Sequence, residues 1–335
     1  MVVGSESETL LDVRGVRKYF AVGGGLFGRR RQWLRAVDGV DLAVRRGETL
    51  GIVGESGCGK STLARLILRL VEPDAGAVLF EGQDVLSLGR QALKAVRREM
   101  QLVSQDPYSS LNPLMPVVDL VGFNLWIRGA RRDQATLNAV LHTLDLVGLS
   151  RSTAYRYPHE LSGGQRQRVS IARALVVRPK LVIFDEAVSA LDKSVQAQVL
   201  NLLRDLQGEL GLAYVFISHD LNMVEYLSDR VAVMYLGKVV ETGSAERLYE
   251  APRHPYTAAL LSATPSLDLD AAAPRIRLEG DIPSPIAPPS GCGFRTRCPR
   301  AMPQCALAAP PLVPLHSDQE VTCFLYAPEA VPASA

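Results

Sequence analysis

One stretch of sequence decides the fold, and it reads Gly54-Glu55-Ser56-Gly57-Cys58-Gly59-Lys60-Ser61-Thr62. It fits the phosphate-loop pattern of a glycine, four further residues and then Gly-Lys-Ser. An apolar run, residues 49–53, precedes it, and a helical run, residues 63–70, follows it. Because the motif requires a strand before it and a helix after it, this context argues against a glycine-rich turn that matches by chance.

The residue types in this loop suit phosphate binding. Glycine tolerates the positive φ angles at which successive backbone N–H groups converge on an anion at a helix N-terminus. We expect Lys60 to reach the β- and γ-phosphates of a nucleotide and the Ser61 hydroxyl to bind Mg²⁺. Cys58 is interpreted as a small residue whose backbone matters, and not as a nucleophile. The whole run from Gly54 to Thr62 is therefore expected to contact the nucleotide.

Composition narrows the class of protein. The 335 residues are 47% hydrophobic and 21% charged, which is typical of a chain with a substantial core. The net charge is only +2, so bulk charge gives no support for a nucleic-acid partner. Residues 1–10 lack a basic segment followed by an apolar core, and no apolar run is long enough to span a membrane. We therefore expect a cytoplasmic chain that reaches a membrane through another subunit.

The order of expected elements indicates an α/β fold. Strands are expected at residues 11–20, 36–44, 49–53, 76–80, 100–104, 180–184 and 213–218, with two more within 230–241. Helices are expected between them, with a helical insertion at about residues 106–168, and the alternation implies a layered structure. Residues 23–33, glycine-rich and then arginine-rich, are expected to form a solvated loop. Prolines become frequent near residue 264, so we divide the chain into residues 1–263 and a cysteine-bearing region, residues 264–335.

Further motifs bring out a family resemblance. Leu161-Ser162-Gly163-Gly164-Gln165 follows the insertion, an apolar strand ends at Asp185-Glu186, and Ser189-Ala190-Leu191-Asp192 and Ile217-Ser218-His219-Asp220 come after it. Together with the phosphate loop, these motifs resemble the ATPase subunit of ABC transporters over about residues 10–250. The resemblance implies a RecA-like P-loop core, an antiparallel β-subdomain and a helical insertion subdomain.

The resemblance also implies roles for single residues. Asp185 would hold Mg²⁺ with Ser61, and Glu186 beside it would act as general base on the attacking water. Gln105 would contact Mg²⁺ or that water, and His219 would hydrogen-bond the γ-phosphate. The family usually has proline after the two carboxylates, and this chain has Ala187. That change removes a rigid turn element but no ligand.

Two more contacts with ATP are implied. Tyr19 would stack on adenine at the end of an early strand, with its neighbour Phe20 as a competitor for that role. Ser162, Gly163, Gly164 and Gln165 would serve the γ-phosphate of the ATP held by the opposing subunit. The family therefore implies a head-to-tail dimer that encloses two nucleotides.

A narrower resemblance rests on three features. They are the stretch Gln105-Asp106-Pro107-Tyr108-Ser109-Ser110-Leu111-Asn112-Pro113, the motif His254-Pro255-Tyr256-Thr257, and four C-terminal cysteines. These resemble the ATPases of oligopeptide and dipeptide importers, some of which carry nickel or other small solutes. The implied partners are a second, related ATPase subunit, two membrane-spanning permease subunits and an extracytoplasmic solute-binding protein. The chain would then lie on the cytoplasmic face of the membrane.

The cysteines Cys292, Cys298, Cys305 and Cys323 are clustered in sequence. Because structural disulfides are disfavoured in the cytosol, four nearby thiols indicate metal ligands first. Zinc sites more often begin with a shorter spacing, and free or oxidised thiols are a third alternative. The importer family implies a [4Fe–4S] cluster. We expect a structural or regulatory role for it, because nothing in the sequence connects these cysteines to the phosphate loop.

Two other functions are alternatives to an importer subunit. Soluble ABC ATPases of DNA repair or of ribosomes usually carry long coiled-coil insertions or two cassettes, and this chain shows one cassette without extended heptads. A redox-sensing protein would leave the ATPase motifs unexplained. Within the transporter class, an exporter often fuses spanning helices to the ATPase, and none is evident here. The surfaces that select the transported solute would belong to the other chains of such a transporter.

Overall fold

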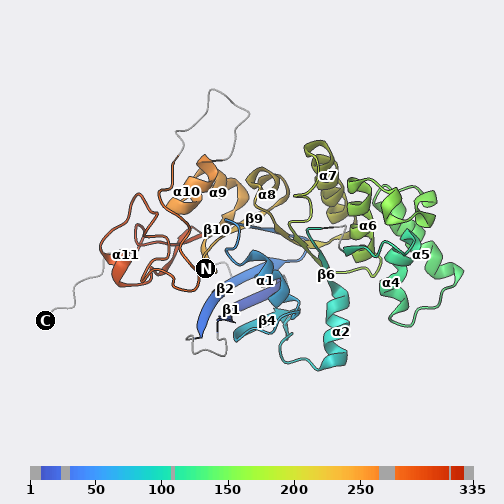
Figure 1. The fold of residues 1–335 in the computed structure, drawn as a ribbon, viewed down its shortest axis with the longest axis horizontal. Coiled ribbons are helices and arrows are strands. Elements are labelled where there is room, and N and C mark those ends of the chain that lie inside the picture. The colour runs from blue at the N-terminus through green and yellow to red at the C-terminus, as the bar shows by residue number, and fades with distance from the viewer. Residues whose placement is uncertain (1–8, 24–30, 107–109, 264–275, 317, 328–335) are drawn as a thin grey trace.

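The computed structural model describes residues 9–23, 31–106, 110–263, 276–316 and 318–327. Within these ranges the strands form two sheets (Figure 1). The smaller sheet has the order β2-β1-β4-β5, with every neighbouring pair antiparallel. Its strands are β1 (Thr9–Val22), β2 (Gln32–Arg45), β4 (Ala75–Phe80) and β5 (Gln83–Asp84). This sheet is the antiparallel subdomain that the resemblance implied.

The larger sheet has the order β11-β12-β10-β9-β3-β8-β7-β6. Its parallel part comprises β3 (Thr49–Val53), β6 (Met100–Val103), β7 (Leu181–Asp185), β8 (Ala213–Ile217) and β9 (Arg230–Tyr235). The antiparallel edge comprises β10 (Lys238–Ser244), β11 (Leu312–His316) and β12 (Gln319–Thr322). The α/β class predicted from the sequence is confirmed.

The parallel strands are buried on both faces, which explains their continuous apolar sequences. Along β7, Leu181 and Ile183 face one core while Val182 and Phe184 face the other. The first core also takes the inner face of the antiparallel sheet and helix α1 (Lys60–Ile67). The second core lies under α6 (Gly163–Leu175), α7 (Lys193–Leu210) and α8 (Leu221–Leu227).

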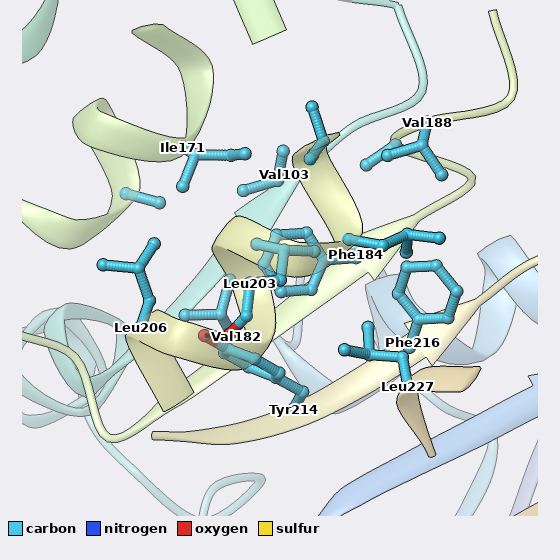
Figure 2. Packing of buried hydrophobic residues seen from close by; sticks show 14 of the residues in the cluster. Val103, Ile171, Val182, Phe184, Val188, Leu203, Leu206, Tyr214, Phe216 and Leu227 are labelled. Atoms are coloured by element: carbon cyan, nitrogen blue, oxygen red, sulfur yellow. Dashed lines mark hydrogen bonds between the residues drawn. The ribbon is translucent and has the colours of Figure 1, made fainter. Parts of the chain in front are cut away.

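Figure 2 shows the second core from close by, with side chains from strands and helices interleaved. Phe184 meets Tyr214 edge to face, with ring centroids 5.1 Å apart. The buried hydroxyl of Tyr214 donates to the carbonyl oxygen of Leu203 at 3.0 Å, so its polar end is satisfied within α7. This packing fixes the ends of β7 and β8, from which the acidic and histidine motifs project.

The helical insertion lies to one side of the sheet (Figure 1). It contains α4 (Val117–Trp126), α5 (Gln134–Leu146), the 3₁₀ turns η2 (Arg151–Tyr155) and η3 (Pro158–Glu160), and the start of α6. Val140 and Leu144 on α5, and Val147 directly after it, are fully buried, so one face of this helix packs into the core. The remaining helices are α2 (Arg90–Glu99), α9 (Ala245–Glu250), α10 (Pro255–Ser262) and α11 (Gln304–Leu307).

Three details differ from the expected elements. Helix α1 ends at Ile67 and not at residue 70. Two residues after that end, Arg69 has a positive φ of 49°, which is not a helical conformation. Strand β2 begins at Gln32, so Trp33 pairs with Ala21 and is not in a loop. Residues 24–30 of that insertion lie outside the described residues. The strands β5, β11 and β12 were not expected, because each is short or contains proline.

The C-terminal region joins the main sheet. Strand β12 pairs with β10 through Glu241 and Val321, so residues on both sides of position 264 share one sheet. The division into residues 1–263 and 264–335 therefore stays a prediction. No helix in the described ranges is long and apolar enough to cross a membrane.

Candidate active site

The phosphate loop runs from buried strand β3 into α1, as the motif required. A Cβ atom at Gly54 would lie 2.2 Å from the carbonyl oxygen of Met234. At Gly59, where φ is 108°, it would lie 2.1 Å from the carbonyl oxygen of Ala36. Both glycines are thus required by close backbone approach as well as by backbone conformation. Ser56 is exposed and Thr62 half-buried in the first turn of α1.

The side chain of Lys60 lies within the loop and is almost fully buried. Its ammonium group donates to the carbonyl oxygens of Gly54 at 2.7 Å and Glu55 at 3.1 Å. The Cys58 sulfur lies 3.8 Å from the same nitrogen. Burial raises the pKa of the Cys58 thiol, which is consistent with a structural residue and not a nucleophile.

Ser61 and Asp185 are in direct contact. The Ser61 hydroxyl donates to Oδ1 of Asp185 at 2.7 Å. Burial raises the pKa of Asp185, the Ser61 hydrogen bond lowers it, and the Glu186 carboxylate raises it. The two oxygens predicted to share a magnesium ion therefore lie at one point, where α1 meets the end of β7.

Glu186 is the meeting point of the other predicted catalytic residues. Its Oε2 accepts a hydrogen bond of 3.1 Å from the Gln105 amide and lies 3.4 Å from Nδ1 of His219. Its φ of 51° is unusual for a residue other than glycine, and its N–H donates to Ile217 at 3.0 Å. Non-glycine residues in this conformation cluster at functional sites, where the surrounding structure holds them.

Tyr19 lies on the antiparallel sheet beside the phosphate loop. It pairs with Arg35 on β2, next to the residue Ala36 that touches Gly59. Its hydroxyl donates to Asp38 at 2.5 Å, and the Arg35 guanidinium lies 5.8 Å from its ring centroid. Burial raises the pKa of Tyr19, and the Asp38 hydrogen bond and charge raise it further. Phe20 is more exposed than Tyr19.

Ser162 begins helix α6 with a reciprocal cap. Its hydroxyl accepts from the N–H of Gln165 at 3.3 Å, and its own N–H donates to the Gln165 side chain at 3.0 Å. At Gly164, a Cβ atom would lie 2.5 Å from Val195, so the helix packs closely on α7 there. Helix α6 lies with α4 and α5, apart from α1 (Figure 1). Within the described residues, the side-chain hydrogen bonds of Ser162 and Gln165 stay inside this cap, and none joins them to the phosphate loop or to Glu186.

The sequence interpretation missed a set of contacts to the phosphate loop. The Arg297 guanidinium forms two hydrogen bonds to the carboxylate of Glu55, at 2.7 and 2.9 Å. The N–H of Glu55 donates to the hydroxyl of Tyr256 at 2.9 Å. Arg297 directly precedes Cys298, so the cysteine-bearing region contacts the phosphate loop, a connection that the sequence did not indicate. Arg297 is one of many arginines in the sequence, and no local pattern marks it as the partner of Glu55.

The four C-terminal cysteines do not form a ligand set. Across the described part of the chain, no three His, Cys, Asp or Glu side chains are placed to hold a metal ion. Cys292 and Cys305 are nonetheless neighbours, since the N–H of Cys292 donates to the Cys305 carbonyl at 2.8 Å. Burial raises the pKa of Cys292, Cys298 and Cys323, and nearby thiols raise it further. As placed, these residues do not fit a [4Fe–4S] cluster.

Comparison with known proteins agrees with this geometry. The ABC transporter family profile matches residues 37–189, and the profile of the oligopeptide/dipeptide transporter C-terminal region matches residues 240–305. The oligopeptide transport ATP-binding protein AppF of Bacillus subtilis is 48% identical over 97% of this chain and 100% of its own length. A probable peptide ABC transporter ATP-binding protein, y4tS of Sinorhizobium fredii, is 50% identical over 97% of this chain and 92% of its own length.

A solved structure is also similar. The ATP-binding cassette MJ0796, in a dimeric post-hydrolysis state bound to ADP and Pi, superposes with a TM-score of 0.62 at 28% identity. The match covers 70% of this chain and 99% of that one. Fold and loop together define a P-loop ATPase of the ATP-binding cassette class. The chain belongs to the family of ABC transporter ATP-binding subunits that carry the oligopeptide/dipeptide C-terminal region.

Proposed function

We propose that this chain is the ATP-hydrolysing subunit that energises an ABC importer of dipeptides or oligopeptides. One observation carries the hydrolytic part: Gln105, Glu186 and His219 converge beside the contact of Ser61 with Asp185. That places a carboxylate, an amide and an imidazole around one point next to the phosphate loop. The peptide part is supported by the C-terminal region and by the named relatives.

The proposed binding step uses the loop and its flanks. The loop N–H groups from Gly54 to Thr62 would hold the phosphates, and Lys60 would exchange its two loop carbonyl contacts for phosphate oxygens. Tyr19 would stack on adenine, with one ring face toward Arg35. Mg²⁺, when bound, neutralises phosphate charge, and Ser61, Asp185 and Gln105 would hold it.

In the proposed hydrolytic step, Glu186 accepts a proton from the attacking water. Gln105 donates to the same carboxylate and would orient it, while His219 would donate to the γ-phosphate. Positioned proton transfer of this kind contributes about 10²–10⁴ in rate. No side-chain hydrogen bond among the described residues joins Ser162 or Gln165 to this group, and we propose that Ser162, Gly163, Gly164 and Gln165 serve the ATP of an opposing subunit in a head-to-tail dimer. MJ0796 is itself described as dimeric.

The proposed assembly extends beyond the ATPase pair. A second homologous ATPase subunit, two permease subunits and an extracytoplasmic solute-binding protein would complete it, with the chain peripheral on the cytoplasmic face. No nucleic acid is part of this assembly. Closure of the pair on two ATP molecules would move the permeases, and hydrolysis would reopen it.

The test begins with a tagged chain purified from detergent-solubilised native membranes under anaerobic conditions. We expect mass spectrometry to identify two multi-spanning proteins and a second ATPase. The complex, reconstituted with its binding protein, should hydrolyse ATP faster when a peptide mixture is added, and Ni²⁺ serves as the control solute. A chain recovered alone, or with ribosomes or DNA, would contradict the transport proposal.

A [4Fe–4S] cluster at Cys292, Cys298, Cys305 and Cys323 stays a separate prediction. Ligand type and number favour it, whereas the placement of the side chains does not support it. Iron and acid-labile sulfide should be measured on the anaerobically purified chain, with zinc measured in parallel. About four iron atoms per chain would support the cluster, and iron far below one per chain would refute it.

A further inference from the structure

The C-terminal region contacts the phosphate loop through the buried side chain of Arg297. Nη1 and Nη2 of Arg297 each bond one carboxylate oxygen of Glu55, across a sequence separation of 242 residues. Two parallel bonds of this kind fix the direction of the carboxylate as well as its distance. The Arg297 side chain is only 8% exposed and that of Glu55 is 22% exposed, so solvent screens the pair weakly.

Glu55 is held a second time through its backbone. Its N–H donates to the hydroxyl of Tyr256, which is fully buried. The Tyr256 ring packs against Phe294, with centroids 5.3 Å apart, and both rings contact Tyr235. Because Phe294 and Arg297 belong to the same short segment, one piece of the C-terminal region determines where Glu55 lies.

The position of Glu55 matters to the loop for two reasons. Its carbonyl oxygen is one of the two that accept from the Lys60 ammonium, at 3.1 Å. Its carboxylate is a negative charge on a loop whose function is to bind negative phosphates. An unpaired carboxylate there would repel the ligand, and weak screening would make that repulsion large.

We propose that Arg297 is a positioning residue for the phosphate loop. It neutralises Glu55 and fixes it, so that the loop and Lys60 present a positive, preorganised site to the triphosphate of ATP. The inference rests on ATP binding by this loop, which is part of the proposed function, and does not depend on the transported solute.

The alternative is that Arg297 only fastens the C-terminal region to the rest of the chain. Loss of the arginine would then lower thermal stability without a charge-dependent loss of ATP affinity. The two roles are separated by removing the partner charge as well. If repulsion by Glu55 weakens binding, then neutralising Glu55 in the same chain restores it, whereas a fastening role gains nothing from that second change.

The experiment measures the Kd for ATP with Mg²⁺ on the full-length chain at low and high salt, for Arg297→Ala, Arg297→Lys, Glu55→Gln and the double variant Glu55→Gln/Arg297→Ala. We expect Arg297→Ala to raise Kd roughly tenfold at low salt and less at high salt. Arg297→Lys should be intermediate, since it keeps the charge and loses the fork. The double variant should return to within about threefold of Glu55→Gln, because the unpaired carboxylate is gone.

Arg295→Ala is the matched control. This arginine lies in the same segment, but it donates to the carbonyl oxygen of Ser290 and not to the loop. Its Kd should stay within about twofold of the unsubstituted chain.

A folded Arg297→Ala chain that binds ATP as the unsubstituted chain does would overturn the inference. If Arg297→Ala does not fold, the double variant Glu55→Gln/Arg297→Ala is the test. A Kd for ATP about tenfold higher in the double variant than in Glu55→Gln would also overturn the inference. An unsubstituted chain that binds ATP no better than Lys60→Ala would instead defeat the proposed function.

Discussion

Gln105 and Glu186 are 81 residues apart in sequence and meet through a hydrogen bond of 3.1 Å. Gln105 follows β6 and Glu186 follows β7, and these strands pair in parallel. Residues after neighbouring parallel strands meet at one edge of the sheet, which is where α/β proteins place their sites. The contact also connects the start of the helical insertion to the proposed base. A movement of the insertion would therefore be felt at the carboxylate.

The substitution Glu186→Gln should separate ATP binding from hydrolysis. It keeps the shape of the side chain and removes its ability to accept a proton. We expect steady-state phosphate release from the assembled complex to fall about 10²–10⁴-fold, while the Kd for ATP stays within about threefold. Glu225→Gln on the exposed face of α8 is the control for loss of a carboxylate. Undiminished turnover in Glu186→Gln would remove Glu186 from the role of base.

Asp185→Asn should change the requirement for magnesium. The Ser61 hydroxyl can still bond the new amide oxygen, so the contact at 2.7 Å need not be lost. The negative charge that favours a divalent cation is lost, however. We expect the Mg²⁺ concentration for half-maximal hydrolysis to rise roughly 10–100-fold. Asp205→Asn, exposed on α7, is the control, and an equal Mg²⁺ requirement in both variants would contradict the assignment.

Local pattern was enough to predict the parallel core. Continuous apolar runs such as residues 181–184 require burial on both faces, and glycines at fixed offsets specify the loop. The joining of β12 to β10 was not predictable, because Pro314 interrupts the apolar pattern of its neighbour β11 and the pairing depends on chain reversal. The ion pair of Arg297 with Glu55 was also not predictable from the sequence. No local sequence pattern distinguishes an arginine that pairs with a residue of the phosphate loop from one that is exposed to solvent.

Gly208→Ala should stabilise the chain. Gly208 lies near the end of α7, and a Cβ atom there would meet nothing within 4 Å. Alanine reduces the freedom of the unfolded chain and favours helix by about 0.5–1 kcal/mol. Denaturant unfolding should show this gain in the free energy of unfolding, with unchanged ATP affinity. Gly59→Ala is the contrasting variant, because its methyl group would overlap the Ala36 carbonyl, and it should lose stability and ATP binding together.

The buried His254 should make the protein sensitive to mild acid. Burial lowers the pKa of His254 to about 4, from 6.5 for an ordinary histidine. The imidazole is 2% exposed, and its Nδ1 accepts from the N–H of Tyr256 at 3.0 Å, so it must be neutral there. Because the unfolded chain binds the proton more readily, stability is complete above pH 6.5 and declines as the pH falls toward 4.

Between pH 7.5 and pH 5 this one group should cost about 2 kcal/mol of unfolding free energy. His254→Asn keeps an oxygen that can cap α10 and removes the titrating group, so the decline should become shallower even if stability at pH 7.5 is lower. Urea unfolding at pH 7.5 and at pH 5 measures this decline in the free energy of unfolding. His159→Asn, at an exposed position, controls for histidine number. Parallel declines in His254→Asn and the unsubstituted chain would show that other groups govern the response to acid.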